Sequence, residues 1–571
     1  MNQALLGSNR QCSFGFEPVN FNTGNFMLEA LDYRKSQASG MPFEILRTYN
    51  AQSETTDGAF GEKWASEYTQ HLCMYQDGTV GYRKWDGALV LFTEGADGMV
   101  CSTSDHLRLE KEGDGFTITT PEGKQYGFDH YGLLVKIIQS GMETALERDE
   151  NGVLTKVRTS FGWQAEITAD EKGHITSIAL PGGAQISYRY DGNRLISMTD
   201  VRGNTVRYIY DAEGRMTEWY DAAGNRQVEN TYDVENRVVF QRDAVNGTYT
   251  LEYEKGHTTV TDADGKGSGI WYDQRFRTIK EADAEGNTYF YDYDATGNLT
   301  AKTDGEGHLT SYQSDEKGNI TQITRADGNV VKNTYDDSGR LLTETDGNGN
   351  ITHYKYDENG NLIHTTYADG SEVVYSYDKN GCLIQQTDEN GHTVIYTYDE
   401  AGNILTSTDS LGNVSSYEYD MAGNCTAAID PLGNRMEWTY DAAGNKTSEQ
   451  VADGTVKKWI YDASGNIASE TDGEGNTTVY EYDSFGNLTH TAYPDGSEES
   501  CTYDGFGHML SKADAFGNAS LYNMMAQVIS LKRQIHLGVR QSIPIMQMDR
   551  KLRCYFRLVQ KRSISTMWQM V

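Results

Sequence analysis

The chain has 571 residues and a formal net charge of -34, which is too long for one ordinary core and predicts several domains or a repeat array. Its 59 Gly do not recur at every third position and its 38 Tyr are too many for a disordered chain, so collagen and disorder are excluded. Its 83 acidic residues against 49 basic ones argue against nucleic acid or an anionic membrane as a partner, because phosphate binding needs clustered Lys and Arg.

The amino-terminal residues carry no recognisable targeting signal. Residues 1–20 lack a basic segment followed by an apolar run, and no later run reaches the roughly 18 apolar residues of a membrane span. The 7 Cys are scattered and never spaced as CxxC, so neither a disulfide framework nor a zinc site is predicted. We therefore expect no membrane span, no metal and no cofactor.

A repeat of 21 residues dominates the rest of the chain and is clearest between residues 335 and 517. If each Tyr of a recurring Tyr-Asp pair is numbered position 1, Gly occupies positions 5 and 15 of every unit. The repeat signature comprises Tyr335, Asp336, Gly339, Tyr356, Asp357, Gly360, Tyr377, Asp378, Gly381, Tyr398, Asp399, Gly402, Tyr419, Asp420, Gly423, Tyr440, Asp441, Gly444, Tyr461, Asp462, Gly465, Tyr482, Asp483, Gly486, Tyr503, Asp504 and Gly507.

Each unit predicts a β-hairpin. In residues 356–378 the segments DENGN and ADGS supply residues that tolerate positive φ, and the segments between them are rich in Leu, Ile, Val, Thr and Tyr. Position 7 is mostly apolar, with Lys446 an exception, and positions 20 and 22 share one strand face. Position 20 is aromatic in most units: Tyr354, Tyr375, Tyr396, Tyr417, Trp438, Trp459 and Tyr480.

Weaker copies of the unit extend the array toward the amino terminus, from Phe128-Asp129 onward. About twenty hairpins then fill residues 128–528, which at ~4.8 Å between strands gives a sheet on the order of 190 Å long. A flat sheet of that length is unstable, and strand twist coils a long antiparallel ribbon. We predict an all-β fold in which tandem 21-residue hairpins form a long coiled sheet or an open, barrel-like shell.

Residues 529–571 break the repeat pattern, with 9 Lys and Arg against one acid, Asp549. One interpretation is a basic amphipathic helix, because the segment KLRCYFRLVQKR brings Leu552, Phe556 and Val559 near one face, where a membrane or a partner could bind.

Codon content favours a second interpretation of this tail. Read one base earlier, the codons of Met546–Asp549 encode Ala, then Asn or Asp, then Gly, as in the repeat turn Tyr367–Gly370. Met567–Val571 treated in the same way gives Val-Ala-(Asn or Asp)-Gly, which matches Val451–Gly454. Our hypothesis is that a frameshift near residue 528 interrupts a longer repeat protein.

The repeat motifs resemble those of a known family. The pattern Y-D-x-x-G-N-L followed by T-D-x-x-G-N is similar to that of Rhs/YD-repeat proteins, which include bacterial polymorphic toxins and the teneurin shells. The stretch before the repeats resembles the domain that commonly precedes Rhs repeats, with Glu17 where the family usually has Asp. The residues that carry this second resemblance are Glu17-Pro18-Val19-Asn20, Thr23-Gly24-Asn25, Asp32-Tyr33, Gly40-Met41-Pro42-Phe43, Arg47-Thr48-Tyr49-Asn50 and Phe60-Gly61-x-x-Trp64.

The resemblance implies three parts and a structural role. Residues 1–127 are expected to form a β-rich amino-terminal domain, residues 128–528 the Rhs/YD array, and residues 529–571 a non-repeat basic tail, which our codon hypothesis attributes to a frameshift. The family's shell holds a carboxy-terminal toxin that a self-cleaving aspartyl core often releases, and neither part is recognisable in this chain. We therefore expect a non-enzymatic shell portion of a secreted or cell-surface toxin, without catalytic residues, truncated before that core. Its partners would be the cognate toxin domain or a secretion apparatus.

Two alternatives remain open. The array could be a standalone cell-surface protein for adhesion or carbohydrate binding, in which the Tyr rows stack on sugars; the half-buried positions of these rows favour a core role instead. An enzyme within residues 1–127 is the other alternative, for which the sequence offers no catalytic constellation.

Calcium binding is a further candidate for the Asp-rich turns. The best local match is Asp262-x-Asp264-x-Lys266-Gly267, followed by Asp273, but Lys stands at a ligand position and turn chemistry alone explains the Asp residues. The residues His257, His308 and His392 occupy slots that other units fill with Asn, so we interpret them as turn residues.

Overall fold

The computed structural model describes residues 18–521, apart from 36–41, 57, 96–97, 102, 104–105, 161, 245, 484 and 504–508. The described residues all belong to one compact unit, Met1–Tyr522. The predictions that concern Glu17, Gly40-Met41, Asp504, Gly507 and the tail 529–571 lie outside the described residues.

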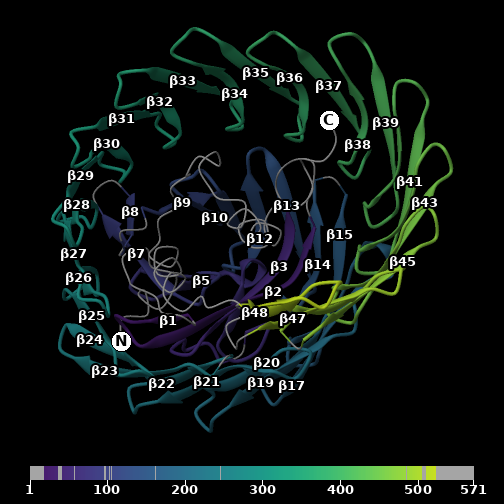
Figure 1. The fold of residues 1–571 in the computed structure, drawn as a ribbon. Coiled ribbons are helices and arrows are strands. Elements are labelled where there is room, and N and C mark those ends of the chain that lie inside the picture. Colours follow the sequence, from purple (N-terminus) through teal and green to yellow (C-terminus); the bar gives the residue numbers. More distant parts are fainter. Residues whose placement is uncertain are drawn as a thin grey trace. The chain divides into compact units, whose positions relative to one another are not determined.

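The amino-terminal part of this unit consists of two four-stranded antiparallel sheets (Figure 1). The fully buried side chains of Phe26, Tyr49 and Trp64 place the core of this part between β2, β3 and β4. The first sheet contains β1 (Val19–Asn20), β2 (Asn25–Lys35), β3 (Phe43–Asn50) and β4 (Trp64–Ser66), and the 3-10 turn η2 (Glu67–Thr69) connects it to the second sheet, β5 (His71–Met74), β6 (Val80–Arg83), β7 (Leu89–Gly95) and β8 (Gly98–Cys101).

The rest of the unit is one antiparallel sheet of 41 strands, β9 to β49, in which each strand pairs with the next along the chain; we call it the wall. Its first strands are β9 (Arg108–Glu112), β10 (Gly115–Thr119), β11 (Gln125–Phe128), β12 (Leu134–Gln139), β13 (Met142–Arg148), β14 (Leu154–Thr159), β15 (Gln164–Ala169), β16 (Ile175–Ala179), β17 (Gln185–Asp191), β18 (Arg194–Thr199), β19 (Thr205–Tyr210), β20 (Met216–Tyr220), β21 (Arg226–Tyr232), β22 (Val238–Asp243), β23 (Thr248–Glu254), β24 (His257–Asp262), β25 (Gly267–Tyr272) and β26 (Thr278–Ala282), with the 3-10 turn η3 (Pro181–Gly183) after β16.

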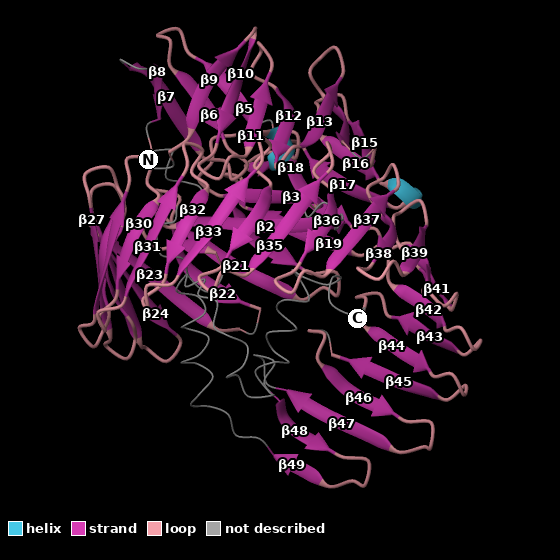
Figure 2. Ribbon diagram, turned by 90° about the horizontal axis from the view of Figure 1, so that it is seen from above, coloured by secondary structure: helices cyan, strands magenta, loops and turns pink. Residues whose placement is uncertain are grey.

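The remaining wall strands follow the 21-residue unit closely. They are β27 (Thr288–Tyr293), β28 (Leu299–Thr303), β29 (Leu309–Ser314), β30 (Ile320–Thr324), β31 (Val330–Tyr335), β32 (Leu341–Thr345), β33 (Ile351–Tyr356), β34 (Leu362–Thr366), β35 (Glu372–Tyr377), β36 (Leu383–Thr387), β37 (Thr393–Tyr398), β38 (Ile404–Thr408), β39 (Val414–Tyr419), β40 (Cys425–Ile429), β41 (Arg435–Tyr440), β42 (Lys446–Gln450), β43 (Val456–Tyr461), β44 (Ile467–Thr471), β45 (Thr477–Tyr482), β46 (Leu488–Ala492), β47 (Glu498–Tyr503), β48 (Met509–Ala513) and β49 (Ala519–Leu521). Figure 2 shows the last of these side by side, from β41 to β49.

The Tyr-Asp turn explains why the chain reverses at each unit. In the turn after β41, the Asp441 Oδ1 accepts the backbone N–H groups of Ala443 and Asn445 at 2.9 Å, and the Asn445 side chain donates to Oδ2 at 2.8 Å. Gly444 has φ 82°, a conformation that costs a residue with a Cβ on the order of 1 kcal/mol. The invariant Asp and Gly are therefore turn residues, each fixed by local chemistry.

A regular β-bulge coils the wall. The register shifts by one residue at the Tyr of each signature unit from Tyr335 to Tyr503, for example between Thr439 and Tyr440 and between Ile460 and Tyr461. Bulges increase the right-handed twist of the strand that carries them, and twist accumulates along a sheet. The strands accordingly follow one another around a ring (Figure 1), which confirms the predicted all-β coiled shell of repeats.

The two faces of the wall differ in composition. In β45 the residues Thr478, Tyr480 and Tyr482 are half-buried, whereas Val479 and Glu481, on the opposite face, are exposed. The Tyr-bearing face continues through successive strand pairings, and in the first part of the wall it packs against β2 and β3, which lie within the ring (Figure 1). We call this face the inner face.

Successive coils of the wall contact each other through their turns. The Asn204 side chain donates to the Ala463 carbonyl, and Arg202 donates to the Ser464 carbonyl at 3.2 Å, 262 residues further along the chain. Nearer the start of the wall, His106 lies within hydrogen-bond distance of Asn298, only 192 residues away. The number of residues per coil therefore increases along the chain.

The wall begins earlier than the repeat pattern indicates. Strand β9 starts at Arg108, before the first recognisable unit at Phe128. The sequence pattern does not mark the β9–β10 hairpin because this hairpin turns at Gly113 without a Tyr-Asp pair. The division of the chain at residues 127 and 528 stays a prediction.

Candidate functional site

The most elaborate polar and aromatic cluster among the described residues lies where β2, β3 and β4 cross the inner face of the wall. At its centre the guanidinium of Arg47 donates to both oxygens of Asp32, at 2.5 and 2.8 Å, and neither side chain is exposed to solvent. From the wall, the Tyr188 hydroxyl donates to Asp32 at 2.7 Å, and the Tyr208 hydroxyl accepts from Arg47 at 3.2 Å. A buried ion pair thus joins the amino-terminal strands to β17 and β19.

Aromatic rings enclose this ion pair. Arg47 lies 4.5 Å from the Trp64 ring centroid and 5.2 Å from that of Tyr188. The ring of Phe60 meets Tyr188 edge-on at 5.3 Å, and Trp64 meets Tyr208 in the same way at 5.1 Å. Rings in such geometry contribute beyond their buried area, and a desolvated cation over them adds further attraction.

The enclosure sets the ionisation of the cluster. Burial disfavours the charged form of Arg47, but the charge and hydrogen bond of Asp32, together with Tyr208 and Tyr188, outweigh burial and raise the Arg47 pKa well above its ordinary value. Burial and, after it, the charge of Asp32 raise the pKa of Tyr188 well above its ordinary value. The guanidinium of Arg47 therefore stays charged and the phenols of Tyr188 and Tyr208 stay neutral, which suits a permanent joint rather than proton transfer.

Further hydrogen bonds fasten the edges of the same joint. The Tyr49 hydroxyl donates to the Gly214 carbonyl at 3.0 Å and accepts the Met216 N–H at 2.8 Å. The Trp64 indole donates to the Tyr210 hydroxyl at 3.0 Å. These contacts bring β3 and β4 against the Tyr-Asp turn that follows β19.

Backbone contacts extend the joint over several units of the wall. Near the start of the wall, Glu67 accepts the Tyr126 hydroxyl at 3.0 Å and the Leu72 N–H donates to the Gly132 carbonyl at 2.8 Å. Further along, the Asn22 side chain donates to the Phe276 carbonyl at 2.8 Å and to Thr278 at 2.9 Å. The amino-terminal segment therefore contacts the wall from residue 126 to residue 278, and the Lys35 ammonium also donates to Asn424 in a later coil at 3.2 Å.

The sequence marks one side of this joint. Asp32, Arg47, Tyr49 and Trp64 all belong to the motifs that resemble the domain preceding Rhs repeats. Their wall partners carry no comparable signal, since Tyr188 and Tyr208 are ordinary position-20 residues of units that match the 21-residue pattern only weakly. The one available indication was that position 20 is aromatic and shares a face with position 1.

The repeat signature is distributed along the wall and does not gather into one site. Each described carboxylate of the signature Tyr-Asp pairs accepts the backbone N–H of the residue four positions later. These carboxylates are Asp336, Asp357, Asp378, Asp399, Asp420, Asp441, Asp462 and Asp483. The glycines of the same turns have φ between 75° and 88°: Gly339, Gly360, Gly381, Gly402, Gly423, Gly444, Gly465 and Gly486.

The signature Tyr residues connect neighbouring hairpins. In six units the hydroxyl donates to the carbonyl of the residue 15 positions earlier, which lies at position 7 of the preceding unit. These are Tyr335, Tyr398, Tyr440, Tyr461, Tyr482 and Tyr503. The other three, Tyr356, Tyr377 and Tyr419, occupy the same strand-end position. The Tyr row is therefore a structural ladder on the inner face.

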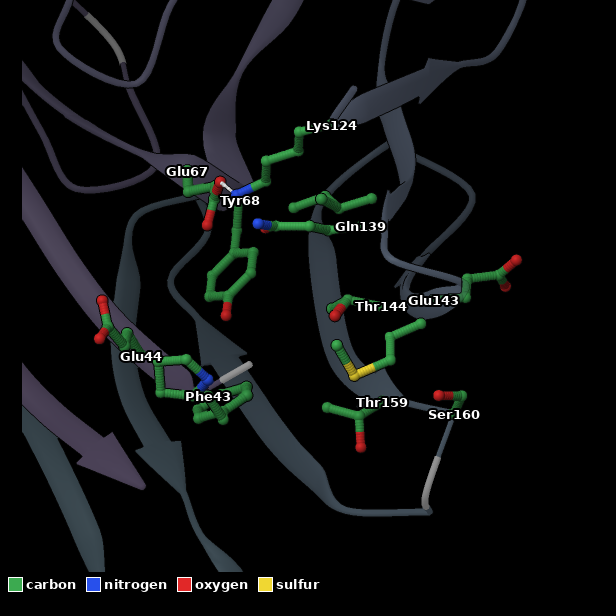
Figure 3. A pocket seen from close by; sticks show the side chains of 13 residues that line it. Phe43, Glu44, Glu67, Tyr68, Lys124, Gln139, Glu143, Thr144, Thr159 and Ser160 are labelled. Atoms are coloured by element: carbon green, nitrogen blue, oxygen red, sulfur yellow. Dashed lines mark hydrogen bonds and ion pairs between the residues drawn. The ribbon is translucent and has the colours of Figure 1, made fainter. Parts of the chain in front are cut away.

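A small pocket lies beside the joint, between β3, η2 and the wall strands β12 to β14 (Figure 3). Its volume is about 120 Å³, and its 13 lining residues include no His, Cys or Asp. Lys124 forms an ion pair with Glu67, which also accepts the Tyr126 hydroxyl at 3.0 Å. Burial raises the pKa of Tyr68, which projects between Glu44 and Thr144 in Figure 3. These groups form no nucleophile and base pair.

The candidate calcium residues take up turn positions instead. The Asp262 carboxylate accepts the backbone N–H groups of Asp264 and Lys266, at 3.0 and 2.9 Å. Within residues 18–521, leaving out the masked gaps, no group of three or more His, Cys, Asp or Glu could hold a metal ion. The same part of the chain contains no helix long and apolar enough to cross a membrane.

Two of the three His residues behave as interpreted. The backbone N–H of His308 and that of His392 each donate to the Asp that begins the turn, at 2.9 Å. His257 differs, because it is the first residue of β24, where its ring stacks on Trp271 at 4.3 Å. The turn before it contains only two residues, so the slot that is a turn elsewhere is a strand here.

Family models match successive parts of this architecture. The Teneurin YD-shell model matches residues 268–427, and the RHS Repeat model matches residues 192–227, 419–456 and 461–498. The chain is an Rhs/YD-repeat protein. A Domain of unknown function (DUF6531) matches residues 16–92, so in this Rhs/YD-repeat protein that domain supplies the strands that dock on the wall.

Relatives of this Rhs/YD-repeat protein are much longer than the matched region. It is 27% identical over 279 residues to Double-stranded DNA deaminase toxin A of Burkholderia cenocepacia, a match that covers 45% of this chain and 19% of the relative. It is 26% identical over 288 residues to Probable deoxyribonuclease RhsA of Dickeya dadantii, covering 46% and 19%, and 28% identical over 260 residues to tRNA nuclease WapA of Bacillus subtilis, covering 44% and 11%. The match thus spans less than a fifth of these relatives.

Among solved structures, the TcdB2-TccC3-Cdc42 crystal structure is similar with a TM-score of 0.47 and 13% identity, covering 86% of this chain and 30% of that one. The TcdB2-TccC3 structure without its hypervariable carboxy-terminal region has a TM-score of 0.47 and 13% identity, covering 78% and 30%.

Proposed function

We propose that this Rhs/YD-repeat chain is the wall portion of a shell that encloses the toxin polypeptide of a secreted or cell-surface toxin. The proposal is supported by one observation above the others: the inner face of the wall is a surface on which a polypeptide already binds, through the Arg47–Asp32 joint. A coiled wall whose turns stack from coil to coil, as at Arg202 and Ser464, is suited to surround a chain held on that face.

In this proposal the role of the chain is structural. The amino-terminal strands close part of the inner face, and the coiled hairpins separate the cargo from its surroundings. The names of the relatives include a deaminase toxin and nucleases; we propose that such an activity belongs to the cargo, and that the cognate toxin domain and a secretion apparatus are the partners. Nucleic acid is not expected to bind the wall, whose net charge is strongly negative.

Protease protection tests the proposal. A protease-sensitive reporter polypeptide is fused to the carboxyl end of the full chain, and its cleavage is compared with that of the same reporter added separately to the unfused chain. We expect cleavage of the fused reporter to be at least tenfold slower, because enclosure restricts access. Equal cleavage rates for the fused and the separate reporter would contradict enclosure.

A further inference from the structure

A second cation and aromatic cluster lies on the inner face, far along the chain from the Arg47 joint. The Lys446 ammonium is 5.5 Å from the Trp438 ring centroid and 5.7 Å from that of Trp459. Glu449 accepts hydrogen bonds from Lys446 at 2.9 Å and from the Trp438 indole at 3.0 Å. We call Trp438, Lys446, Glu449, Lys457 and Trp459 the Trp438 patch.

Strand register places the whole patch on the inner face. Trp438 of β41 is opposite Glu449 of β42, and Glu449 is in turn opposite Lys457 of β43. Residues directly opposite each other in paired strands share a face. Trp438 and Trp459 both occupy position 20, the same row as Tyr188 and Tyr208 in the first part of the wall.

The patch accounts for an exception in the repeat. Position 7 is apolar in most units, but Lys446 replaces the apolar side chain in the unit that also carries Trp459 and follows directly on the unit of Trp438. A Lys at this position would otherwise introduce an unpaired charge among aromatic rings; here Glu449 and the two indoles accommodate it.

The Arg47 joint shows how this row binds a polypeptide. There the amino-terminal strands β2 to β4, with the loop between β3 and β4, form the docking segment. This segment packs Phe60 against Tyr188 and Trp64 against Tyr208 and leaves these two wall residues only 3% and 4% exposed. A cation lies over the rings in both clusters, Arg47 in the first and Lys446 in the second.

The two clusters differ in what covers them. In the Trp438 patch the Lys446 side chain is 38% exposed, Trp459 is half-buried and Lys457 is exposed. The patch thus repeats the aromatic and charged composition of a surface that binds polypeptide. Trp438 itself is only 6% exposed, so the accessible groups of the patch are the Trp459 ring and the ammonium groups of Lys446 and Lys457.

We propose that the Trp438 patch binds a segment of an enclosed polypeptide, with the Trp459 indole, which packs in the same row as the buried Trp438, contacting aromatic side chains and Lys457 pairing with a carboxylate. This inference rests on the proposed function and adds a recognition site to it. The cargo is selected by aromatic and acidic side chains close together in sequence, a combination that the docking segment itself carries in Phe60, Glu62 and Trp64.

A synthetic peptide with the sequence of residues 58–66 and a benzophenone photo-crosslinker at its amino end is a suitable probe. On the full chain we expect crosslinks to map to β41, β42 and β43. They should decrease at least fivefold in a chain with Trp438→Ser and Trp459→Ser. The matched control is Trp271→Ser, which removes an indole from the opposite face of the wall and should leave crosslinking unchanged. Crosslinks that persist in the double variant, or that lie on other strands, overturn the proposal.

A second variant keeps the test decisive if the double variant does not fold. Because Lys457 is exposed, Lys457→Gln should fold normally and weaken binding of the peptide about threefold. It should have no effect on the same peptide carrying Gln in place of Glu62; equal effects on both peptides would overturn the carboxylate pairing. Protection of the reporter without peptide crosslinking would reject binding at the Trp438 patch and retain the proposed shell. Crosslinking without protection of the reporter would reject the proposed shell and retain peptide binding at the patch.

Discussion

The guanidinium of Arg47 lies 4.5 Å from the centre of the Trp64 ring while it is paired with Asp32 inside the joint. The Arg47–Asp32 pair connects the first strands of the chain to a wall segment about 150 residues further along, because the Tyr188 hydroxyl donates a hydrogen bond to the Asp32 carboxylate. Several properties of the molecule can be tested from it and from the turns.

Replacement of Asp32 by Ala should be strongly destabilising. It leaves the Arg47 charge buried without a counter-ion, which costs about 3–5 kcal/mol of the free energy of unfolding. Arg34→Ala is the matched control on the same strand, because the Arg34–Glu44 pair is partly exposed and should contribute below about 1 kcal/mol. Urea denaturation measures both, and hydrogen exchange of β17 and β19 shows where the loss occurs. Similar losses for the two variants would show that the buried pair does not hold the joint.

The hydroxyl of Tyr440 should stabilise the adjacent hairpin. Tyr440→Phe removes the hydrogen bond to the Cys425 carbonyl and should cost about 0.5–1.5 kcal/mol. The effect should be local, because stability in a repeat array is shared mainly between neighbouring units. Faster hydrogen exchange in β40 and β41 is the expected readout. The control Tyr131→Phe, at a 73% exposed side chain, should change nothing beyond about 0.5 kcal/mol.

Turn glycines are required for their backbone conformation. Gly412 has φ 83° and open space where a Cβ would lie, so Gly412→Ala tests conformation alone and should cost about 1–2 kcal/mol. Gly267 also has open space but lies outside the left-handed region; Gly267→Ala should be neutral or stabilise by up to about 1 kcal/mol. Thermal unfolding distinguishes the two, and an equal response would remove the conformational explanation.

Low pH should destabilise the turn that contains Asp294. Slight burial opposes the charge of Asp294, but hydrogen bonds from Thr296, Gly297 and Asn298 prevail and lower the Asp294 pKa to about 2. A folded pKa below the unfolded value of 3.8 contributes stability at neutral pH that is lost as pH falls from about 4 to about 2. Asp294→Asn should therefore lose less stability than wild type over this interval. Its deficit at pH 6 should stay below about 1 kcal/mol because the carboxylate is partly exposed. Identical pH profiles by circular dichroism would count against this assignment.

The gene should contain further repeats in a second reading frame. Codons for Met546–Asp549 and Met567–Val571 encode repeat turns when read one base earlier, so we expect resequencing beyond codon 571 to show hairpin units that continue in that frame. An open reading frame without the 21-residue pattern downstream would favour the amphipathic-helix interpretation of residues 529–571.

Local chemistry made most of the fold predictable. Asp441 and Gly444 act through neighbours within four residues, so hairpin positions follow from sequence spacing alone. His257 was misjudged because its unit uses a two-residue turn, which moves the residue into β24. The β9–β10 hairpin before Phe128 carries no repeat signal for a related reason, since its turn lacks the Tyr-Asp pair.

The joint and the coil contacts could not be predicted in the same way. The pairing of Arg47 with Tyr208, 161 residues away, depends on how strongly the wall curves, which is the sum of many small twists. Likewise, Arg202 meets Ser464 and not a neighbouring turn because of the number of hairpins in that coil. Neither the curvature of the wall nor the number of hairpins in a coil can be inferred from a local sequence motif.

The contacts between coils have a consequence for changes in repeat number. Insertion of one 21-residue unit between Thr278, the last wall residue that Asn22 contacts, and Ser464 would bring Arg202 opposite the preceding turn of the following coil, where the same Asp, Gly and Asn groups recur. Most turn-to-turn contacts could form again one unit out of step, whereas the joint at Tyr188 and Tyr208, which lies before the insertion, would be unaffected. The protein can therefore gain or lose hairpins in its later coils without changing the Arg47 joint, so the length of the wall can vary independently of the way the amino-terminal strands dock on it.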